Sequence, residues 1–227
     1  MSTALYDPIK AQAKITDSVI VGFSGGKDSL VTLDLCARYF KNVRAYFLYS
    51  VPNLSFQERC LRAYEEKYNL EIIRLPNTDV SERLKKGIFT LADKDVPIIR
   101  FQDIYDYLRN ETGMYWIAGG ERAADSIERN AMLKKIGSTN YEMGRFYPLA
   151  WWKEKEVLNY IKVHKLPYFD MKEGFLPQQL YEIREYFPND WQRLLHMYPF
   201  MGAALERALR KEEQEEREER ELRNGEQ

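Results

Sequence analysis

The alternation of apolar and polar residues along the chain predicts strands that alternate with helices. The short apolar run 18–23 indicates a buried strand, and residues 43–49, rich in β-branched and aromatic side chains, indicate a second one. Between them, apolar residues recur with helical spacing over 28–40. A strand, a helix and another strand in this order make the βαβ unit of a parallel sheet, so the pattern favours the α/β class.

Further elements continue the same alternation. Ser55 and Glu58 have the spacing of a capping box, at the start of a helix that we expect to reach Tyr68. A later helix over 153–164 is amphipathic, and we expect four of its apolar residues to face inward: Val157, Leu158, Tyr160 and Ile161. The remaining predicted elements are strands at 71–75 and 114–118, a less regular helical stretch at 80–111, and helices at 122–135 and 190–223.

The last predicted helix is densely charged from residue 206 to residue 223. It holds acidic residues four positions before basic ones, a spacing that supports an exposed helix. We interpret this segment as a solvated face, and the alternative is a helix that binds a protein partner. The pairs are Glu213–Arg217, Glu216–Arg220 and Glu219–Arg223.

Charge and cysteine content exclude several classes of protein. The 227 residues have a formal net charge of -1, so there is no broad basic field and nucleic-acid binding is not indicated. Two cysteines, Cys36 and Cys60, stand without a Cys-x-x-Cys pair, which argues against a zinc ribbon, an iron–sulfur site or a disulfide scaffold. We expect both to be packed in helices. His164 and His196 have no partner at metal-binding spacing and are expected to be structural or exposed.

Two further features concern the cellular location. No run of about 18 apolar residues occurs, so we expect no membrane contact. Residues 1–14 lack the apolar centre and cleavage site of a signal peptide. We therefore expect a cytoplasmic protein.

The strongest candidate for chemistry is the loop between the first strand and the first helix. There, backbone N–H groups and the positive end of a helix dipole would meet at one point and bind an anion. Glycines let the backbone approach closely, and a positive φ is expected at one or both of them; the lysine adds a positive charge and the serines add hydroxyl donors. The residues are Ser24, Gly25, Gly26, Lys27, Asp28 and Ser29.

This loop is not a Walker loop. That motif needs glycine where Val21 stands and Ser or Thr where Asp28 stands. The six-residue string instead resembles the SGGKDS signature of the PP-loop ATP pyrophosphatase superfamily. The resemblance implies an adenine nucleotide alpha-hydrolase-like, Rossmann-like parallel sheet flanked by helices, with a helical C-terminal extension, and ATP as the ligand.

Two later segments resemble the phosphoadenosine phosphosulfate (PAPS) reductase and ATP sulfurylase small-subunit group within that superfamily. Residues 118–129 (AGGERAADSIER) are similar to its G-x-R-x-x-(D/E)-S-x-x-R segment. Residues 146–161 are similar to its PL-x-x-W segment, and Leu166-Pro167-Tyr168 and Gly174-Phe175 are similar to the LPY and glycine–aromatic stretch of that group. In residues 146–161 we expect Trp152, Val157 and Tyr160 to be core residues.

The resemblance implies a set of site residues. Lys27 and Arg122 would act in catalysis by stabilising charge on the departing pyrophosphate. Asp28 would hold Mg²⁺, directly or through water. Alternatively, Arg122 and Arg129 are both exposed on a helix, where they form ion pairs with Glu121 and Asp125. The residues implied in nucleotide binding are Ser24, Gly25, Gly26, Lys27, Asp28, Ser29, Gly120, Arg122 and Arg129.

The chain also departs from that group. A thiol-dependent PAPS reductase needs a cysteine in its C-terminal segment, and this chain has none after Cys60. The second-strand segment, residues 48–53 (LYSVPN), lacks the aspartate and the threonine-glycine usual near the nucleotide. Adenine and ribose contacts are therefore expected to differ.

Three hypotheses result. The favoured one is an adenylyltransferase that cleaves ATP between its α- and β-phosphates, with Mg²⁺, for an unidentified acceptor. The second is a protein that binds PAPS or APS (adenylyl sulfate) and relies on another protein's thiol. The third is a non-catalytic nucleotide-binding subunit that contacts a partner through the charged C-terminal helix. We expect a nucleotide-binding domain at 15–178 and a helical extension at 179–227.

Overall fold

The structure is a computed structural model that describes residues 3–168 and 175–225. The chain folds into two compact units. The first contains residues 1–49, 57–75 and 100–171, and the second contains 50–56, 76–99 and 172–227.

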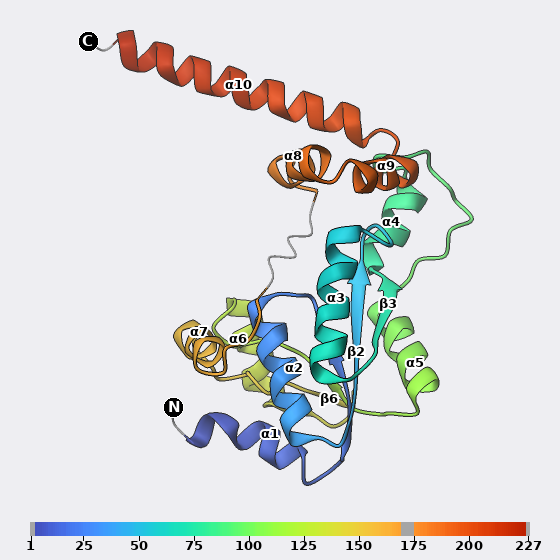
Figure 1. Cartoon of the computed structure of the whole chain (residues 1–227), viewed down its shortest axis with the longest axis vertical. Coiled ribbons are helices and arrows are strands. Elements are labelled where there is room, and N and C mark those ends of the chain that lie inside the picture. Colours follow the sequence, from blue (N-terminus) through green and yellow to red (C-terminus); the bar gives the residue numbers. More distant parts are fainter. Residues whose placement is uncertain (1–2, 169–174, 226–227) are drawn as a thin grey trace. The chain divides into compact units, whose positions relative to one another are not determined.

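The first unit is built on a six-stranded sheet with the order β3-β2-β1-β4-β6-β5 (Figure 1). β1 pairs in parallel with β2 and β4, β4 pairs in parallel with β6, and the edge strand β5 is antiparallel to β6. This confirms the predicted parallel α/β sheet. The strands are β1 (Ser18–Gly22), β2 (Asn42–Tyr49), β3 (Ile72–Pro76), β4 (Ile117–Ala118), β5 (Thr139–Asn140) and β6 (Arg145–Phe146).

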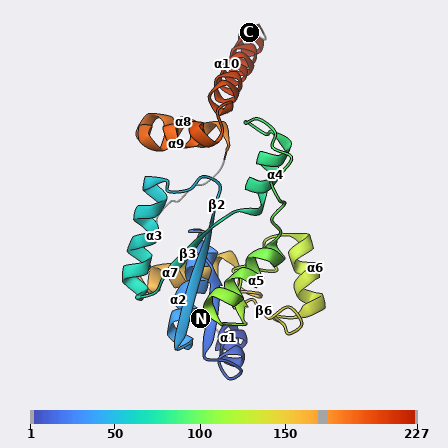
Figure 2. The ribbon, with the colours of Figure 1, turned by 90° about the vertical axis from the view of Figure 1, so that its right-hand side faces the viewer.

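Helices cover both faces of this sheet, because successive strand residues point to opposite faces. Val21, Ala118 and Phe146 are in register and share one core with residues of α2, α3 and α7. Ile20, Ile117 and Arg145 point to the other face, where α5 and α6 lie. Figure 2 shows α2 and α3 on one side of the strands and α5 and α6 on the other. The helices of this unit are α1 (Asp7–Gln12, after a 3-10 turn at Thr3–Tyr6), α2 (Lys27–Tyr39), α3 (Ser55–Tyr68), α5 (Phe101–Thr112), α6 (Ile127–Ile136) and α7 (Glu154–Val163).

A buried carboxylate ties three of these helices together. Asp34 of α2 has a side chain that is only 4% exposed. It accepts hydrogen bonds from the Tyr160 hydroxyl (2.7 Å), the Tyr68 hydroxyl (3.0 Å) and Arg38 Nε (2.6 Å). These bonds join α2 to α3 and α7, and they satisfy the charge that burial would otherwise penalise.

Several predicted boundaries were wrong for identifiable reasons. The fourth strand is short because Arg109 Nε donates a hydrogen bond to the carbonyl oxygen of Tyr115 (3.0 Å), which is then not used for pairing in the sheet. The helix expected from residue 122 begins five residues later, because the N–H of Ala123 bonds to Ala150 O (2.8 Å) and Ser126 caps α6. The stretch 80–111 is two helices, since Gly87 (φ 71°) ends α4 in the left-handed region.

Within α7, Val157 and Tyr160 are buried as predicted, and so is Trp152 before it. Leu158 is 51% exposed, which contradicts the expectation that it faces inward. Gly174 of the predicted family segment lies outside the described residues.

The second unit has a hydrophobic core of its own. Leu180, Trp191, Tyr198 and Leu205 pack there with Val51. The sequence predicted one helix over 190–223, but a break at Tyr198 divides this region into two helices. A further helix, which the sequence did not predict, ends before a break at Phe187. Its helices are α4 (Thr78–Lys86), α8 (Pro177–Tyr186), α9 (Pro188–Met197) and α10 (Met201–Gly225).

In the second unit, Asp190 accepts hydrogen bonds from Ser55, the first residue of α3. It is fully buried and accepts hydrogen bonds from Ser55 N (2.8 Å) and Ser55 Oγ (2.6 Å). Glu58 pairs with Arg74 Nη2 at 3.2 Å. The predicted capping box between Ser55 and Glu58 was therefore wrong, because a carboxylate from α9 takes both Ser55 donors.

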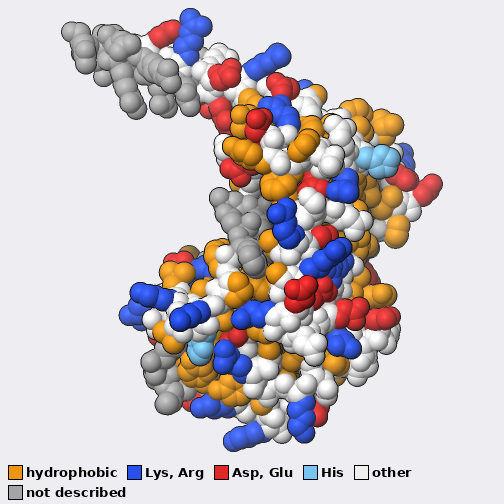
Figure 3. Space-filling model, viewed as in Figure 1, with side chains coloured by type: hydrophobic (Ala, Val, Ile, Leu, Met, Phe, Trp, Pro, Cys, Tyr) orange, Lys and Arg blue, Asp and Glu red, His pale blue; other side chains and the backbone are white. Residues whose placement is uncertain are grey.

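The surface carries both charges, in line with the net charge of -1. Figure 3 shows acidic and basic side chains interspersed over the face in view. Of the helices in the described ranges, none combines the length and the apolar character needed to cross a membrane.

Candidate nucleotide site

The candidate site lies where the strand order of the sheet reverses, between β1 and β4. In open α/β sheets this point leaves a crevice at the carboxyl ends of the strands, where ligands bind. Here β1 runs into the glycine loop and α2, and β4 runs into Gly119 and Gly120. A Cβ on Gly120 would lie 3.2 Å from Ser29 N and 3.3 Å from the carbonyl carbon of Asp28. The two turns are therefore packed against each other.

The glycine loop has the form of an anion cradle. Gly25 has a positive φ of 78°, whereas Gly26 is extended (φ -75°, ψ 161°) and precedes the first residue of α2. The first turn of a helix has no intrahelical acceptors for its N–H groups. No described residue accepts from the backbone N–H of Lys27 or Asp28. These groups point out of the helix start and are available to a ligand.

Ser29 holds the loop in shape. Its hydroxyl donates to Gly26 O (2.9 Å) and accepts from Ser24 N (3.2 Å) and Ser24 Oγ (3.1 Å). The Ser29 side chain is buried, and its single proton is used inside the loop. Ser24 is exposed. Of the two predicted hydroxyl donors, Ser24 is thus the exposed one, and its hydroxyl would turn away from Ser29 Oγ to donate to a ligand.

Three charged side chains meet at the start of α2. Lys27 Nζ lies 3.1 Å from Asp28 Oδ2, and Arg122 Nε lies 2.9 Å from Asp28 Oδ1. The Arg122 contact is an ion pair without hydrogen-bond geometry, since neither atom makes a hydrogen bond to a described residue. The sequence predicted all three residues in the site, and the structure brings them together.

Arg122 is the most buried charged residue of this group. Only 4% of it is exposed, and its Nε and Nη1 are buried with no hydrogen-bond acceptor among the described residues. Leaving guanidinium donors unsatisfied in the interior is costly. The side chain lies in the turn before α6 and is not exposed on a helix, so the alternative was wrong on the exposure of Arg122, although the expected pairing with Asp125 is present.

Asp125 links Arg122 to Arg129. It accepts from the Arg122 N–H (2.9 Å), lies 2.7 Å from Arg122 Nη2, and accepts from Arg129 Nη1 (2.8 Å). Burial acts to raise the pKa of Asp125, but the hydrogen bonds from Arg122 and Arg129 and their charges outweigh it and lower the pKa. Arg129 itself is 49% exposed on α6 and reaches the glycine loop only through this chain of contacts.

Sequence reasoning missed one residue at the loop. Glu154, the first residue of α7, places Oε1 3.6 Å from Lys27 Nζ. An acidic residue in the first turn is common for helix-stabilising reasons, so nothing in the sequence marks it as part of the site. Lys27 consequently lies between two carboxylates from different elements.

The cysteines and histidines lie outside this cluster. Burial raises the pKa of Cys36, which is fully buried in α2, and it also raises the pKa of the half-buried Cys60. The ring of His164 packs on Tyr160 at 4.1 Å between centroids. Within residues 3–168 and 175–225, no group of three or more His, Cys, Asp or Glu side chains is arranged to hold a metal ion.

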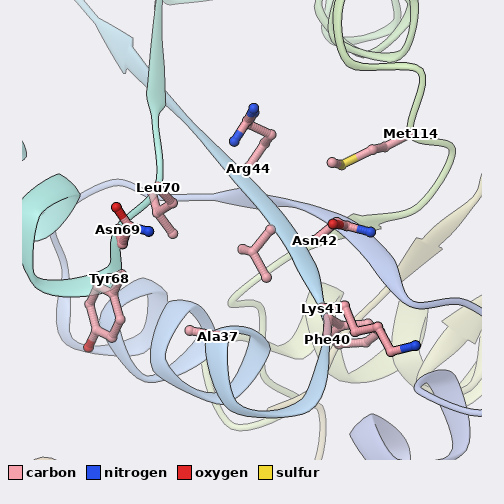
Figure 4. A pocket seen from close by; sticks show the side chains of 10 residues that line it. Ala37, Phe40, Lys41, Asn42, Arg44, Tyr68, Asn69, Leu70 and Met114 are labelled. Carbon is pink, nitrogen blue, oxygen red and sulfur yellow. The ribbon is translucent and has the colours of Figure 1, made fainter.

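A cavity of about 240 Å³ lies at the amino end of β2. Figure 4 shows Arg44 on one side of this strand and Ala37 and Tyr68 on the other. Its polar side chains do not converge on one point, and none of the predicted site residues lines it. The switch point between β1 and β4 therefore remains the candidate site.

The chain belongs to the phosphoadenosine phosphosulfate reductase domain family, whose family model matches residues 18–175. This confirms the resemblance seen in the sequence and places the chain in the PP-loop ATP pyrophosphatase superfamily. The fold class is confirmed as well. An NH3-dependent NAD synthetase from Campylobacter jejuni, solved with a nitrate ion, has a TM-score of 0.50 at 18% identity, covering 92% of this chain and 91% of that one.

Curated relatives match over parts of their length. A glutamine-hydrolyzing GMP synthase from Mannheimia succiniciproducens is 34% identical over 127 residues, 54% of this chain and 24% of that protein. A tRNA-cytidine(32) 2-sulfurtransferase from Dichelobacter nodosus is 28% identical over 172 residues, 66% of this chain and 62% of that protein. An uncharacterized protein of Methanocaldococcus jannaschii is 28% identical over 206 residues, which are 79% of this chain and 41% of that protein. The chain thus spans less than two thirds of each relative.

Proposed function

We propose that this chain binds ATP at the start of α2 and transfers the adenylyl group to an acceptor. An oxyanion of the acceptor attacks the α-phosphorus, the bond to the bridging oxygen of the β-phosphate breaks, and pyrophosphate leaves. The names of the GMP synthase, the NAD synthetase and the tRNA sulfurtransferase support an enzymatic role for the shared domain. The acceptor stays open.

The observation that carries the proposal is the state of Arg122. Its guanidinium is buried beside the glycine loop, where Nε and Nη1 make no hydrogen bond to a described residue and Nε has only the ion pair with Asp28. A phosphate oxygen would satisfy such donors in the bidentate manner that suits a guanidinium. The free N–H groups of Lys27 and Asp28 lie at the same point, so donors from two elements would surround one anion.

Each residue then has a role in this proposal. The amides of the first turn of α2 and Ser24 would hold phosphate oxygens, and Gly25, Gly26 and Gly120 would let them approach. Lys27 and Arg122 would stabilise the charge that grows on the leaving pyrophosphate. Ser29 would keep the loop in shape. Arg129 would act through Asp125, at the outer side of the site.

The residues present also fit Mg²⁺. This ion is usually held by one or two carboxylates together with phosphate oxygens and water, so a cluster of three protein ligands is not required. Asp28 and Glu154 both reach Lys27 Nζ and are therefore close to one another. They would hold the ion, which when bound neutralises phosphate charge.

Replacing Lys27 tests the proposal. Lys27→Ala should lower ATP affinity and pyrophosphate release by about tenfold or more, because a charge next to the phosphates is lost. Its effect on unfolding should stay within about 1 kcal/mol, because the lysine is partly exposed and ion pairs that solvent reaches contribute little to stability. Lys41→Ala, at the opposite end of α2, is the matched control and should leave both activities unchanged. ATP affinity that survives the loss of Lys27 would refute the phosphate cradle.

Binding of PAPS or APS is the second candidate. It is favoured by the two arginines joined at Asp125, which would suit a second anionic group, and by the burial of Cys36, which makes an external thiol necessary. Titration calorimetry with ATP and PAPS in parallel separates the two functions. Tighter binding of PAPS, without pyrophosphate release from ATP, would support the second candidate and contradict the first.

A further inference from the structure

Arg145 is a largely buried cation whose ion-pair partner belongs to the turn after β4. It is the first residue of β6, and its side chain is 17% exposed. The guanidinium lies 5.0 Å from the centroid of the Tyr105 ring and 5.2 Å from that of Tyr147. Burial raises the pKa of both tyrosines, so they remain neutral rings at physiological pH. Two aromatic contacts of this kind restrain the guanidinium strongly.

The remaining partner of Arg145 is Glu121, in the turn that carries Gly120 and Arg122. Arg145 Nη2 donates to Glu121 Oε1 at 2.8 Å. To reach it, the Glu121 side chain folds back over Gly119, where a Cβ would overlap the carboxylate. Glycine at position 119 therefore leaves the space that this ion pair occupies.

The turn after β4 places neighbouring side chains on opposite faces of the sheet. Ile117 and Arg145 are in register on the face of α5 and α6, and Glu121 joins them there. Arg122, the next residue, contacts Asp28 on the face of α2. Consecutive residues of this turn therefore make ion pairs on opposite faces, Glu121 with Arg145 and Arg122 with Asp28.

We propose that Arg145 is a positioning residue for nucleotide binding, which holds the Glu121 carboxylate away from the phosphates and so presents Arg122 to them. The inference rests on the proposed ATP site. Without Arg145, Glu121 is an uncompensated negative charge one residue from Arg122. A carboxylate there would pair with Arg122 and repel an incoming phosphate, both of which weaken binding.

The test compares charge removal at the two ends of this ion pair. Wild type, Arg145→Gln, Glu121→Gln and the double variant are titrated with ATP and Mg²⁺ by calorimetry, and thermal unfolding is recorded for each. Arg145→Gln should bind ATP about tenfold more weakly, since it frees a like charge near the phosphates. Adding Glu121→Gln should restore the affinity to within about threefold of wild type, because the repelling charge is gone.

Arg109→Gln is the matched control. Arg109 also stacks on a tyrosine, Tyr115, at 4.9 Å and bonds to the carbonyl of that residue, but it has no contact with the turn after β4. It should lower the unfolding temperature and leave ATP affinity unchanged. A purely structural role for Arg145 predicts no recovery in the double variant, since the second change removes a further contact.

The outcomes separate the two proposals. A wild-type chain that does not bind ATP overturns the proposed function. A wild-type chain that binds ATP, with Arg145→Gln equal to it or with no recovery in the double variant, overturns the role of Arg145 alone. If Arg145→Gln does not fold, Arg145→Met carries the same comparison, because methionine keeps an apolar side chain beside the two tyrosine rings and loses both the charge and the Nη2 donor that hold Glu121. Wild-type affinity in that variant would overturn the inference.

Discussion

Replacing Gly120 by alanine should separate ATP binding from stability. The added Cβ would lie 3.2 Å from Ser29 N and 3.3 Å from the carbonyl carbon of Asp28, closer than ordinary van der Waals contact. The turn after β4 and the start of α2 would have to part by a few tenths of an ångström. Gly120 does not have a positive φ, so alanine fits its backbone and gains about 0.4–1 kcal/mol through the unfolded chain. This gain offsets much of the cost of the contact.

The expected result is therefore a net stability change within about 1 kcal/mol, or about 2–4 °C in unfolding temperature for a chain of this size. ATP affinity should fall by about tenfold, because donors from two elements are moved apart at a site that needs both. Calorimetric titration with ATP and Mg²⁺, alongside thermal unfolding, measures both effects.

Gly113→Ala provides the opposite case. Gly113 ends α5 with φ 67°, and a Cβ there would meet nothing within 4 Å. Only backbone strain remains, so we expect a loss of about 1 kcal/mol in stability and unchanged ATP affinity. The reasoning on close approach is refuted if Gly120→Ala keeps wild-type affinity, or if both variants lose affinity in proportion to stability.

Three further predictions concern polar side chains that hold the fold together. Tyr160→Phe removes a hydroxyl that donates to the buried Asp34, and denaturant unfolding should show a loss of about 1–3 kcal/mol; no loss would mean that the bond is dispensable. The pKa of Asp125 is lowered in the folded protein, so its carboxylate stabilises the fold fully above the unfolded pKa of about 3.9. This contribution is lost as the pH falls from there through the lower pKa of the folded state. Asp125→Asn should therefore flatten the acid side of the stability curve, and parallel curves for variant and wild type would contradict this. Asp190→Ala leaves two Ser55 donors without their acceptor, and unfolding should again cost about 1–3 kcal/mol unless water replaces the carboxylate fully.

The start of the fold could be predicted from the sequence because its signals are local. The run 18–23, the two glycines after it and the helical spacing to residue 40 each specify their own conformation. The structure has β1 and α2 within a residue or so of the predicted positions. The loop residues from Ser24 to Ser29 likewise lie at one helix start, because they are contiguous.

The boundaries of later elements depend on contacts between residues that are distant in the sequence. The hydrophobic periodicity of a segment carries no information about such contacts. Residues 114–118 looked like one strand, but Arg109 donates a hydrogen bond to the carbonyl of Tyr115, and β4 begins only at Ile117. The breaks at Phe187 and Tyr198 do have a local signal, since each residue precedes a proline and is biased away from the helical region. Only Tyr198 lies within the helix predicted over 190–223, and there the helical pattern outweighed the proline signal.

The same distinction holds within the site. Lys27, Asp28 and Arg122 were identified by motif, and the structure supplies the ion pairs among them. Glu154 and Arg145 belong to no motif that the sequence analysis used. They come close to the site only because α7 and β6 are adjacent to α2 and β4 in the fold.

The length of α10 has a mechanical consequence. Its buried side chains, Met201 and Leu205, are in its first two turns, while the described residues from 210 onward are exposed. A helix advances 1.5 Å and turns about 100° per residue, so inserting a single residue after Leu209 would rotate everything beyond it by about 100° with almost no change in reach. A group attached to the far end of this helix would therefore have a defined direction as well as a defined distance. A flexible linker of the same length would fix only the range of distances.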